Sequence, residues 1–276
     1  MLVIFGASTD IGRRLAARLE AEGTAVRRVG RELPGAVRAD LATGAGMKEA
    51  LDGATTVISC AHARYAGRLL AALPPGVART VLMGSTWRYS RVPNPRADEV
   101  RQGEAEFLAS GRDGVMLHAT MIYGGTQENN IQRLLALLRR LPVVPAPGGG
   151  RQTVQPIHVD DVVACLLAAA KRDWAGPHVV PIAGPKLSWR EMVVACAAAI
   201  GRHPPILPLP AAPLIGALAL ANTLGLRRLD ANVIRRFRED VDVPLDAMTR
   251  TLEVIPRDFD SGVRQAVADW RRAGVI

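Results

Sequence analysis

Short, continuously apolar runs alternate along the chain with segments whose apolar residues recur every three or four positions. The runs are rich in branched residues and are bounded by glycine or polar residues, as is typical of strands buried on both faces. The predicted strands are Val3–Phe5, Val26–Val29, Thr56–Cys60, Thr80–Met83 and Val115–Ile122, and the predicted helices are Ile11–Ala21, Met47–Leu51, Arg68–Leu73, Glu99–Ala109 and Ile131–Leu141. Because strand–helix–strand crossovers are right-handed, this alternation predicts an α/β fold with a doubly wound parallel sheet.

The pattern changes after Leu141. A loop rich in proline and glycine precedes a predicted helix with acidic residues in its first turn (HVDDVVACLLAAA), a strand at Pro177–Ile182 and a helix at Leu187–Gly201. The last third of the chain reads as helical and irregular. We therefore expect a cofactor-binding core, residues 1–125 and 150–183, and a small, mostly helical lobe on the substrate side, residues 126–149 and 184–276.

Composition narrows the class of protein. The chain has 276 residues, of which 49% are hydrophobic, so it can bury a large core. Aromatic residues make up 4%, which argues against a nucleic-acid platform built on base stacking. The net charge of +9 is carried almost entirely by scattered arginines, as a general preference for arginine over lysine would produce. We expect no nucleic-acid partner; the sequence is compatible with a homodimer.

The cysteines and the longest uncharged segment bear on the compartment. Cys60, Cys165 and Cys196 have neither metal-ligand spacing nor an even count, which predicts reduced thiols in the cytoplasm. No charge occurs between His203 and Arg227, but the early prolines leave roughly a dozen residues for a helix, against the ~20 that cross a bilayer. We expect this segment to form a buried helix or to line an apolar pocket, which residues 204–226 would cover, rather than to anchor in or span a membrane. We expect no signal peptide at the N-terminus.

The most informative local pattern is VIFGASTDIGRRLAARL, residues 3–19, in which a strand meets a glycine turn that opens a helix. This order is the context of the Rossmann dinucleotide-binding fingerprint, in which the pyrophosphate lies on the helix N-terminus. Thr9 or Asp10 stands where that fingerprint has its middle glycine. The cofactor contacts predicted here are Gly6, Ser8, Thr9, Asp10, Ile11 and Gly12. We expect the Asp10 carboxylate to face away from the phosphates or to cap the helix.

The end of the second strand selects between NAD and NADP. An acid there binds the ribose 2′-hydroxyl of NAD, whereas arginine admits the 2′-phosphate of NADP. The segment AVRRVGRE carries Arg27, Arg28 and Arg31 and has no acid before Glu32. Guanidinium groups suit phosphate, so the sequence favours NADP(H) over NAD(H), with Arg28 and Arg31 as contacts.

Taken together, these segments resemble the extended and atypical short-chain dehydrogenases/reductases, the superfamily of NAD(P)-dependent epimerases and dehydratases. The resemblance runs nearly end to end, through GASTDIG, the Asp40–Leu41 pair, TTVISCAH, VLMGSTWRYS, MLHATMIYGG and PGGGRQTVQPIHVDDVVACL. It implies a cofactor site in which Asp40 and Leu41 contact the adenine, Cys60 and Ala61 pack on a ribose, and Thr120 lies beside the nicotinamide. The last segment also resembles the NADPH-binding accessory subunit of respiratory complex I.

The chain departs from this family where the chemistry is done. In the family a tyrosine transfers the proton, and a lysine four residues later lowers its pKa from about 10. The tyrosines are Tyr65, Tyr89 and Tyr123, and none is followed by lysine at that spacing. On the expected helix the two family positions hold Asp98 and Gln102.

Ser85 matches the catalytic serine of the family, and Tyr89, four residues later, is a candidate substitute acid, so these two are the predicted catalytic residues. The alternatives are a cofactor contact or strand-end cap for Ser85, and for Tyr89 the structural tyrosine that the resemblance places there. His62 and Tyr123 are weaker candidates, better explained as a ribose or surface contact and a pocket wall. Asp160 and Asp161 are adjacent in a helix and do not face each other, so we interpret them as helix N-terminal charges. No cluster has metal-ligand spacing.

Two functions stay open. The first is an oxidoreductase or an epimerase/dehydratase that acts with NADP(H) on a small carbonyl or sugar-like substrate. The alternative is a non-catalytic module that holds NADPH as a structural element or redox sensor, which the missing Tyr-x-x-x-Lys pair favours.

Overall fold

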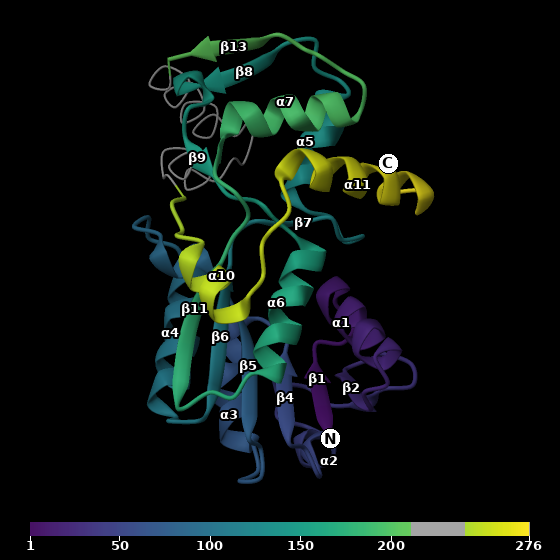
Figure 1. The fold of residues 1–276 in the computed structure, drawn as a ribbon, viewed down its shortest axis with the longest axis vertical. Helices are drawn as coiled ribbons and strands as arrows, with labels where there is room; N and C mark the ends of the chain where they lie inside the picture. The colour runs from purple at the N-terminus through teal and green to yellow at the C-terminus, as the bar shows by residue number, and fades with distance from the viewer. Residues whose placement is uncertain (211–240, 276) are drawn as a thin grey trace.

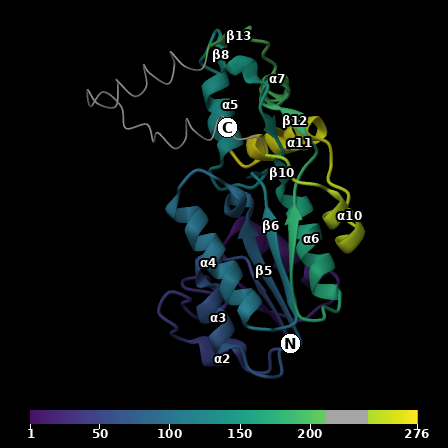
Figure 2. The ribbon, with the colours of Figure 1, turned by 90° about the vertical axis from the view of Figure 1, so that its left-hand side faces the viewer.

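A seven-stranded parallel sheet with helices on both faces organises residues 1–210 and 241–275, the part of the chain that this computed structural model describes (Figures 1 and 2). In spatial order the strands are β11 (Pro177–Ile182), β6 (Gly114–Ala119), β5 (Arg79–Ser85), β4 (Thr56–Ser59), β1 (Leu2–Phe5), β2 (Val26–Gly30) and β3 (Val37–Arg38). All six pairings are parallel. The chain extends from β1 in one direction and then returns to β4 on the other side, which confirms the predicted doubly wound sheet.

Helices cover the two faces of the sheet. On one face α1 (Asp10–Ala21) packs against α6 (Val159–Lys171). The other face is covered by α2 (Met47–Leu51), α3 (Ala66–Ala72) and α4 (Pro95–Ala109), as Figure 2 shows. Each face has its own buried apolar cluster, the first including Leu15 and Leu166 and the second including Leu69 and Phe107.

A third apolar cluster lies beyond the carboxyl ends of the strands, at the top of Figure 1. It is built from α5 (Asn130–Leu138), α7 (Trp189–Ala199) and α11 (Phe259–Arg272), and Trp270 is fully buried in it. Short strand pairs surround it: β7 (Ile122–Tyr123) with β10 (Ile157–His158), β8 (Val144–Pro147) with β13 (Ile206–Leu209), and β9 (Thr153–Val154) with β12 (Leu187–Ser188). α10 (Asp246–Leu252) contacts β11 and α6. Single-turn helices are η1 (Ala63–Tyr65), η2 (Thr86–Tyr89) and η3 (Gly148–Gly150).

Two predictions concern the part of the chain beyond the sheet: its division into domains and the cover over an apolar pocket. The division into a core and a substrate-side lobe stays a prediction. Most of the segment expected to cover an apolar pocket, from residue 211 onward, lies outside the described residues. Within the described ranges, no helix is long and apolar enough to cross a membrane.

Several element boundaries differ from those predicted. α4 begins at Pro95 rather than Glu99, because the Asn94 side chain caps the helix by accepting from the Arg96 N–H, and proline suits the first helical position. β6 ends at Ala119, and the chain then pairs with β10 instead of continuing in the large sheet. The turn that follows β6 therefore leaves the sheet near the expected cofactor.

β11 forms one edge of the sheet and carries two prolines. The carbonyls of Gly176 and Ile182 accept from the N–H groups of Gly114 and Thr120, so the even-numbered residues of this strand face β6. Backbone polar groups alternate sides along a strand, so Pro177 and Pro181 belong to the outward-facing set.

Candidate functional site

The turn after β1 lies where the strand order reverses, between β1 and β4. In open α/β sheets ligands bind at such a point, outside the carboxyl ends of the strands. Gly6 has a φ of +73°, and a Cβ there would lie 3.0 Å from the Ala61 nitrogen at the end of β4. A Cβ on Gly12 would lie 2.3 Å from the Gly6 carbonyl oxygen and 2.8 Å from the Ala7 Cα. Both glycines are therefore required by close backbone approach.

Thr9, which replaces the middle glycine of the fingerprint, closes the turn with its own side chain. Its hydroxyl accepts from the Gly12 N–H at 3.0 Å and donates to the Gly6 carbonyl at 2.8 Å. Its φ of −74° is ordinary for threonine, so glycine is not required here. The first N–H groups of a helix have no intrahelical acceptor. Because the Thr9 hydroxyl already accepts from the Gly12 N–H, the main-chain N–H groups of Asp10 and Ile11 are left at this helix end to bind a phosphate. The Ser8 side chain beside them is exposed.

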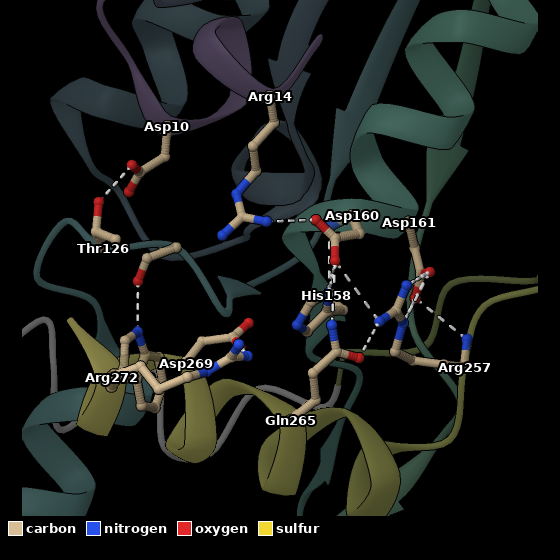
Figure 3. A network of polar contacts seen from close by, with 12 residues as sticks. Asp10, Arg14, Thr126, His158, Asp160, Asp161, Arg257, Gln265, Asp269 and Arg272 are labelled. Atoms are coloured by element: carbon tan, nitrogen blue, oxygen red, sulfur yellow. Dashed lines mark hydrogen bonds and ion pairs between the residues drawn. The ribbon is translucent and has the colours of Figure 1, made fainter. Parts of the chain in front are cut away.

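The Asp10 carboxylate faces the loop after β7, as the sequence led us to expect. It accepts from the Thr126 hydroxyl at 2.6 Å (Figure 3). It also accepts from the Gln127 N–H at 2.6 Å and pairs with Arg13 at 2.5 Å. Burial works to raise the pKa of Asp10, but these bonds outweigh it and hold the pKa below its ordinary value. Asp10 is thus an anion that fixes the loop, and only its backbone N–H is left for a cofactor.

The arginines of β2 divide into two groups. Arg28 pairs with Glu20, near the end of α1 that lies opposite the glycine turn. Ten residues of helix separate Glu20 from the turn, or about 15 Å at 1.5 Å per residue. The Arg27 guanidinium donates to main-chain carbonyls of α2 and of Asp52 just after it. Both side chains leave the middle of the strand, whereas Arg31 directly follows its last residue and is exposed. The contact of Arg28 with the cofactor stays a prediction, and its ion pair with Glu20 favours Arg31 as the phosphate contact.

The residues expected around the adenine and the ribose lie at the ends of neighbouring strands. Asp40 lies just beyond β3, and its carboxylate accepts from the Ala42 N–H. The neighbouring Leu41 side chain is buried. Cys60 and Ala61 follow β4 and contact Gly6. Burial raises the pKa of the Cys60 thiol to about 12, so this cysteine is an unreactive wall of the site.

The two predicted catalytic residues lie at the carboxyl end of β5. Ser85 ends the strand, and its hydroxyl oxygen accepts from the Trp87 N–H at 3.3 Å as the cap of η2. Tyr89 ends η2 and is partly exposed. Thr120 follows the neighbouring strand, but its hydroxyl donates to the Gln155 carbonyl at 2.5 Å, so it braces the loop before β10.

The weaker candidates are also placed. The His62 Nδ1 accepts from the Arg64 N–H and lies 3.7 Å from Glu99 of α4. Burial lowers the pKa of His62. The Tyr123 ring is buried between His158 and Phe259. Asp98 and Gln102, at the family's tyrosine and lysine positions, are exposed on α4.

A buried polar cluster that the sequence did not reveal lies beside Tyr89. We call it the Glu104 cluster; it consists of Arg88, Glu104 and His118. The Glu104 carboxylate, 5% exposed, is 2.5 Å from the Arg88 guanidinium and 2.6 Å from the His118 Nε2. The His118 ring is fully buried in β6, and burial lowers its pKa more than the carboxylate raises it. A histidine within the apolar run MLHAT was the only signal in the sequence.

A second polar network joins the C-terminal part of the chain to the helix of the glycine turn (Figure 3). Arg14 of α1 pairs with Asp160 at the start of α6 at 2.7 Å. Asp161 accepts from both the Nε and the Nη2 of Arg257, which precedes α11. Burial and the nearby Arg257 charge lower the pKa of His158 to about 4, so it caps α6 as a neutral ring. Both acids thus serve the helix start, as expected, and also anchor α11.

The comparisons with known sequences identify distant relatives. No protein-family model matches the chain. Uncharacterized proteins of Mycobacterium tuberculosis and Mycobacterium bovis are 30% identical to it over 216 residues, which is 75% of this chain and 24% of each relative. The chain therefore spans about a quarter of the length of the curated relatives that it matches.

Solved structures similar to this one cover essentially the whole chain. MoeE5 in complex with UDP-glucose and NAD is 22% identical, with a TM-score of 0.73 over 100% of this chain and 99% of its own. A short-chain dehydrogenase/reductase superfamily protein from Agrobacterium tumefaciens with bound NAD is 15% identical, with a TM-score of 0.73 and coverage of 100% and 98%. The UDP-glucose 4-epimerase of Thermotoga maritima is 16% identical, with a TM-score of 0.71 and coverage of 99% of each chain.

This chain has the short-chain dehydrogenase/reductase fold. Its structural neighbours over the full length are members of that superfamily and of its epimerase/dehydratase branch, so the resemblance drawn from the sequence is confirmed at the level of the fold. Within the described residues of this short-chain dehydrogenase/reductase fold, no group of histidine, cysteine or acidic side chains is arranged to hold a metal ion.

Proposed function

We propose that the chain binds NADP(H) at the glycine turn and acts as an oxidoreductase or an epimerase/dehydratase on a small carbonyl or sugar-like substrate in the cytoplasm. The observation that carries the proposal is the contact between Gly12 and the Gly6 carbonyl, at the point where the strand order reverses. It brings the N-terminus of α1 against the end of β1 without intervening side chains, so a pyrophosphate would meet free N–H groups and the positive end of the helix.

The residues around this turn fit a dinucleotide. Gly6 and Gly12 form a cradle that any Cβ would fill, and the buried Cys60 and Leu41 supply apolar walls. A bound nicotinamide would supply or accept a hydride. The chain's own residues would bind the nucleotide, orient the substrate and transfer the proton, with Ser85 polarising a carbonyl and Tyr89 as the acid.

Arg31 supports NADP(H) as the cofactor. It is exposed directly after the last residue of β2, where a ribose 2′-phosphate would lie. The solved neighbours whose descriptions name a cofactor contain NAD, so the preference rests on this residue. A charge-assisted phosphate contact contributes about 1.5–3 kcal/mol, so NADPH should bind at least ~10-fold more tightly than NADH.

Fluorescence or calorimetric titration of both nucleotides tests the cofactor choice. Arg31→Ala should remove most of the preference for NADPH, whereas Arg28→Ala, a matched change three residues earlier within β2, should leave it intact. Equal affinities for the two nucleotides in the unmodified protein would refute the assignment of NADP(H).

The substrate class is supported by the neighbours that act on or bind nucleotide sugars. They include MoeE5 with UDP-glucose, a UDP-glucose 4-epimerase and an NAD-dependent NDP-hexosamine 5,6-dehydratase. A panel of nucleoside diphosphate sugars and small carbonyls, assayed by NADPH absorbance for net redox turnover and by chromatography for epimerisation or dehydration, would find the reaction. Turnover of any of these that is abolished by Tyr89→Phe would support the catalytic assignment.

A non-catalytic NADPH-binding module is the second candidate function. It is favoured by the exposed Asp98 and Gln102, which stand on α4 in place of the family's tyrosine and lysine. If NADPH raises the melting temperature but the panel gives no turnover, this alternative is supported. A ligand at ~100 times its Kd stabilises the folded state by about 2.7 kcal/mol, which a thermal-shift assay detects readily.

A further inference from the structure

The Glu104 cluster has no evident structural need. On α4 the residues that face the sheet are otherwise small or apolar, among them Ala97, Val100 and Phe107. A buried ion pair is often no more stabilising than apolar residues of the same volume, because both charges lose their hydration. Leucine at positions 104 and 118 would therefore fill this space without a desolvation cost, and the polar cluster calls for another use.

The cluster converges on Tyr89. The Arg88 guanidinium lies over the Tyr89 ring, 4.9 Å from its centre, while its other contact is the Glu104 carboxylate. The His118 ring meets the same tyrosine edge-on, with the ring centres 6.0 Å apart. The charged and titratable groups that face Tyr89 are thus Arg88 from its own turn, Glu104 from α4 and His118 from β6.

We propose that Arg88 is a positioning residue that takes over, at Tyr89, the task of the missing lysine, and that Glu104 and His118 hold its guanidinium in place. This inference rests on the proposed function, because it assigns Tyr89 as the acid. As a hydride reaches the substrate carbon, the carbonyl π electrons would move to oxygen and take the phenolic proton. The phenolate left on Tyr89 would then be stabilised by the Arg88 charge until water returns a proton.

The geometry explains why an arginine suits this position. Its planar guanidinium can bind a carboxylate along one edge and still present its face to an aromatic ring, which an ammonium group cannot do. Burial raises the pKa of Tyr89, whereas the charge and hydrogen bonding of Arg88 act to lower it. The arginine therefore opposes the cost of ionising a half-buried phenol.

The test is a titration of Tyr89 in the protein without nucleotide. Phenolate absorbance is followed against pH in each variant and in the same variant with Tyr89→Phe, so that the difference reports Tyr89 alone. In Arg88→Gln, Tyr89 should ionise about one pH unit higher or more, as expected when a cation within ~4–6 Å is lost. Arg88→Lys, which keeps the positive charge but not the planar face, should restore only part of the shift.

Arg101→Gln is the matched control. Arg101 braces the same turn by donating to the carbonyls of Arg88 and Ser90, and its guanidinium pairs with Asp98 rather than with Glu104. It should leave the Tyr89 titration unchanged. If Arg88→Gln does not fold, the double variant Arg88→Gln with Glu104→Gln removes both charges of the ion pair together. It should also shift the Tyr89 titration upward, by less than Arg88→Gln alone would, because the Glu104 charge that raises the pKa of Tyr89 is lost as well.

Turnover gives a second measurement. With any substrate that the panel identifies, Arg88→Gln should lower kcat by ~10² or more while KM and NADPH affinity stay the same. An unshifted Tyr89 titration in Arg88→Gln, or an equal shift in Arg101→Gln, would overturn the inference. Failure to bind NADPH would instead refute the proposed function, and the titration would still report on Arg88.

Discussion

Replacing Gly12 with alanine is the sharpest test of the glycine turn, since it adds a single methyl group. That methyl would lie 2.3 Å from the Gly6 carbonyl oxygen and 2.8 Å from the Ala7 Cα. Both neighbours are backbone atoms, so no rotamer change relieves the contact and α1 must move away from β1. Overpacking of this kind costs about 1–3 kcal/mol. At about 2–4 °C for each kcal/mol, the melting temperature should fall by several degrees.

The same displacement should weaken cofactor binding. The N–H groups of Asp10 and Ile11 belong to the helix that moves, so the helix end and the pyrophosphate lose their alignment. We expect the Kd for NADPH, measured by fluorescence titration of the folded variant below its melting temperature, to rise at least ~10-fold, or ~1.4 kcal/mol. The branched change Gly12→Val should abolish binding.

Gly76→Ala is the matched control for this experiment. A Cβ at Gly76 meets no atom within 4 Å, and the residue is not among those with positive φ. Alanine there should leave NADPH affinity unchanged and stabilise the protein slightly, by up to about 1 kcal/mol. A folded Gly12→Ala protein that binds NADPH as tightly as the Gly76→Ala protein would show that this turn is not the cofactor site.

Three further predictions concern stability. Burial would raise the pKa of Asp10, but its hydrogen bonds hold the pKa below the ordinary value. Its contribution to the free energy of unfolding should therefore be complete above pH ~4 and be lost as the pH falls through the lowered pKa. The difference in unfolding free energy between the native protein and Asp10→Asn should be present at pH 7 and vanish in acid. Asp161→Asn weakens the two charged bonds to Arg257 and should cost about 1.5–3 kcal/mol in urea denaturation, an expectation that an unchanged midpoint would contradict. His118→Leu removes one of the two partners of the Glu104 carboxylate and should lower the free energy of unfolding by about 1–3 kcal/mol. His118→Gln keeps a hydrogen-bond donor for that carboxylate and should lower it by less; an equal loss in both variants would show that the Nε2 contact does not account for the effect.

The elements that the sequence predicted are those with strong local signals. The strands are continuous apolar runs, and the glycine turn follows from two glycines that the backbone contacts require. The two arginines of the predicted phosphate contact differ in their place on the strand: β2 runs through Gly30, so Arg28 lies in its middle and Arg31 follows its end. The sequence placed the end of this strand at Val29, one residue short of the observed end, but it gave no sign that Arg28 pairs with Glu20.

The Glu104 cluster escaped prediction for a different reason. Glu104 and His118 lie 14 residues apart, one on a helix and one on a strand, and their contact depends on how α4 packs over the sheet. From the sequence alone, a glutamate in a helix rich in charged residues is predicted to be exposed. Pairings of this kind arise from tertiary structure, so the sequence could supply the individual residues but not the cluster.

The two prolines of β11 limit how this sheet can grow. Of the outward-facing positions of that strand, 177, 179 and 181, two are prolines, so within the described part of the chain this edge offers one N–H group, that of Val179. At the opposite edge β3 is two residues long. A strand from another molecule would find too few donors at one edge and too little length at the other, which protects the sheet against edge-to-edge aggregation. If two copies associate, we expect them to meet through helices and loops, and a continuous intermolecular sheet is disfavoured.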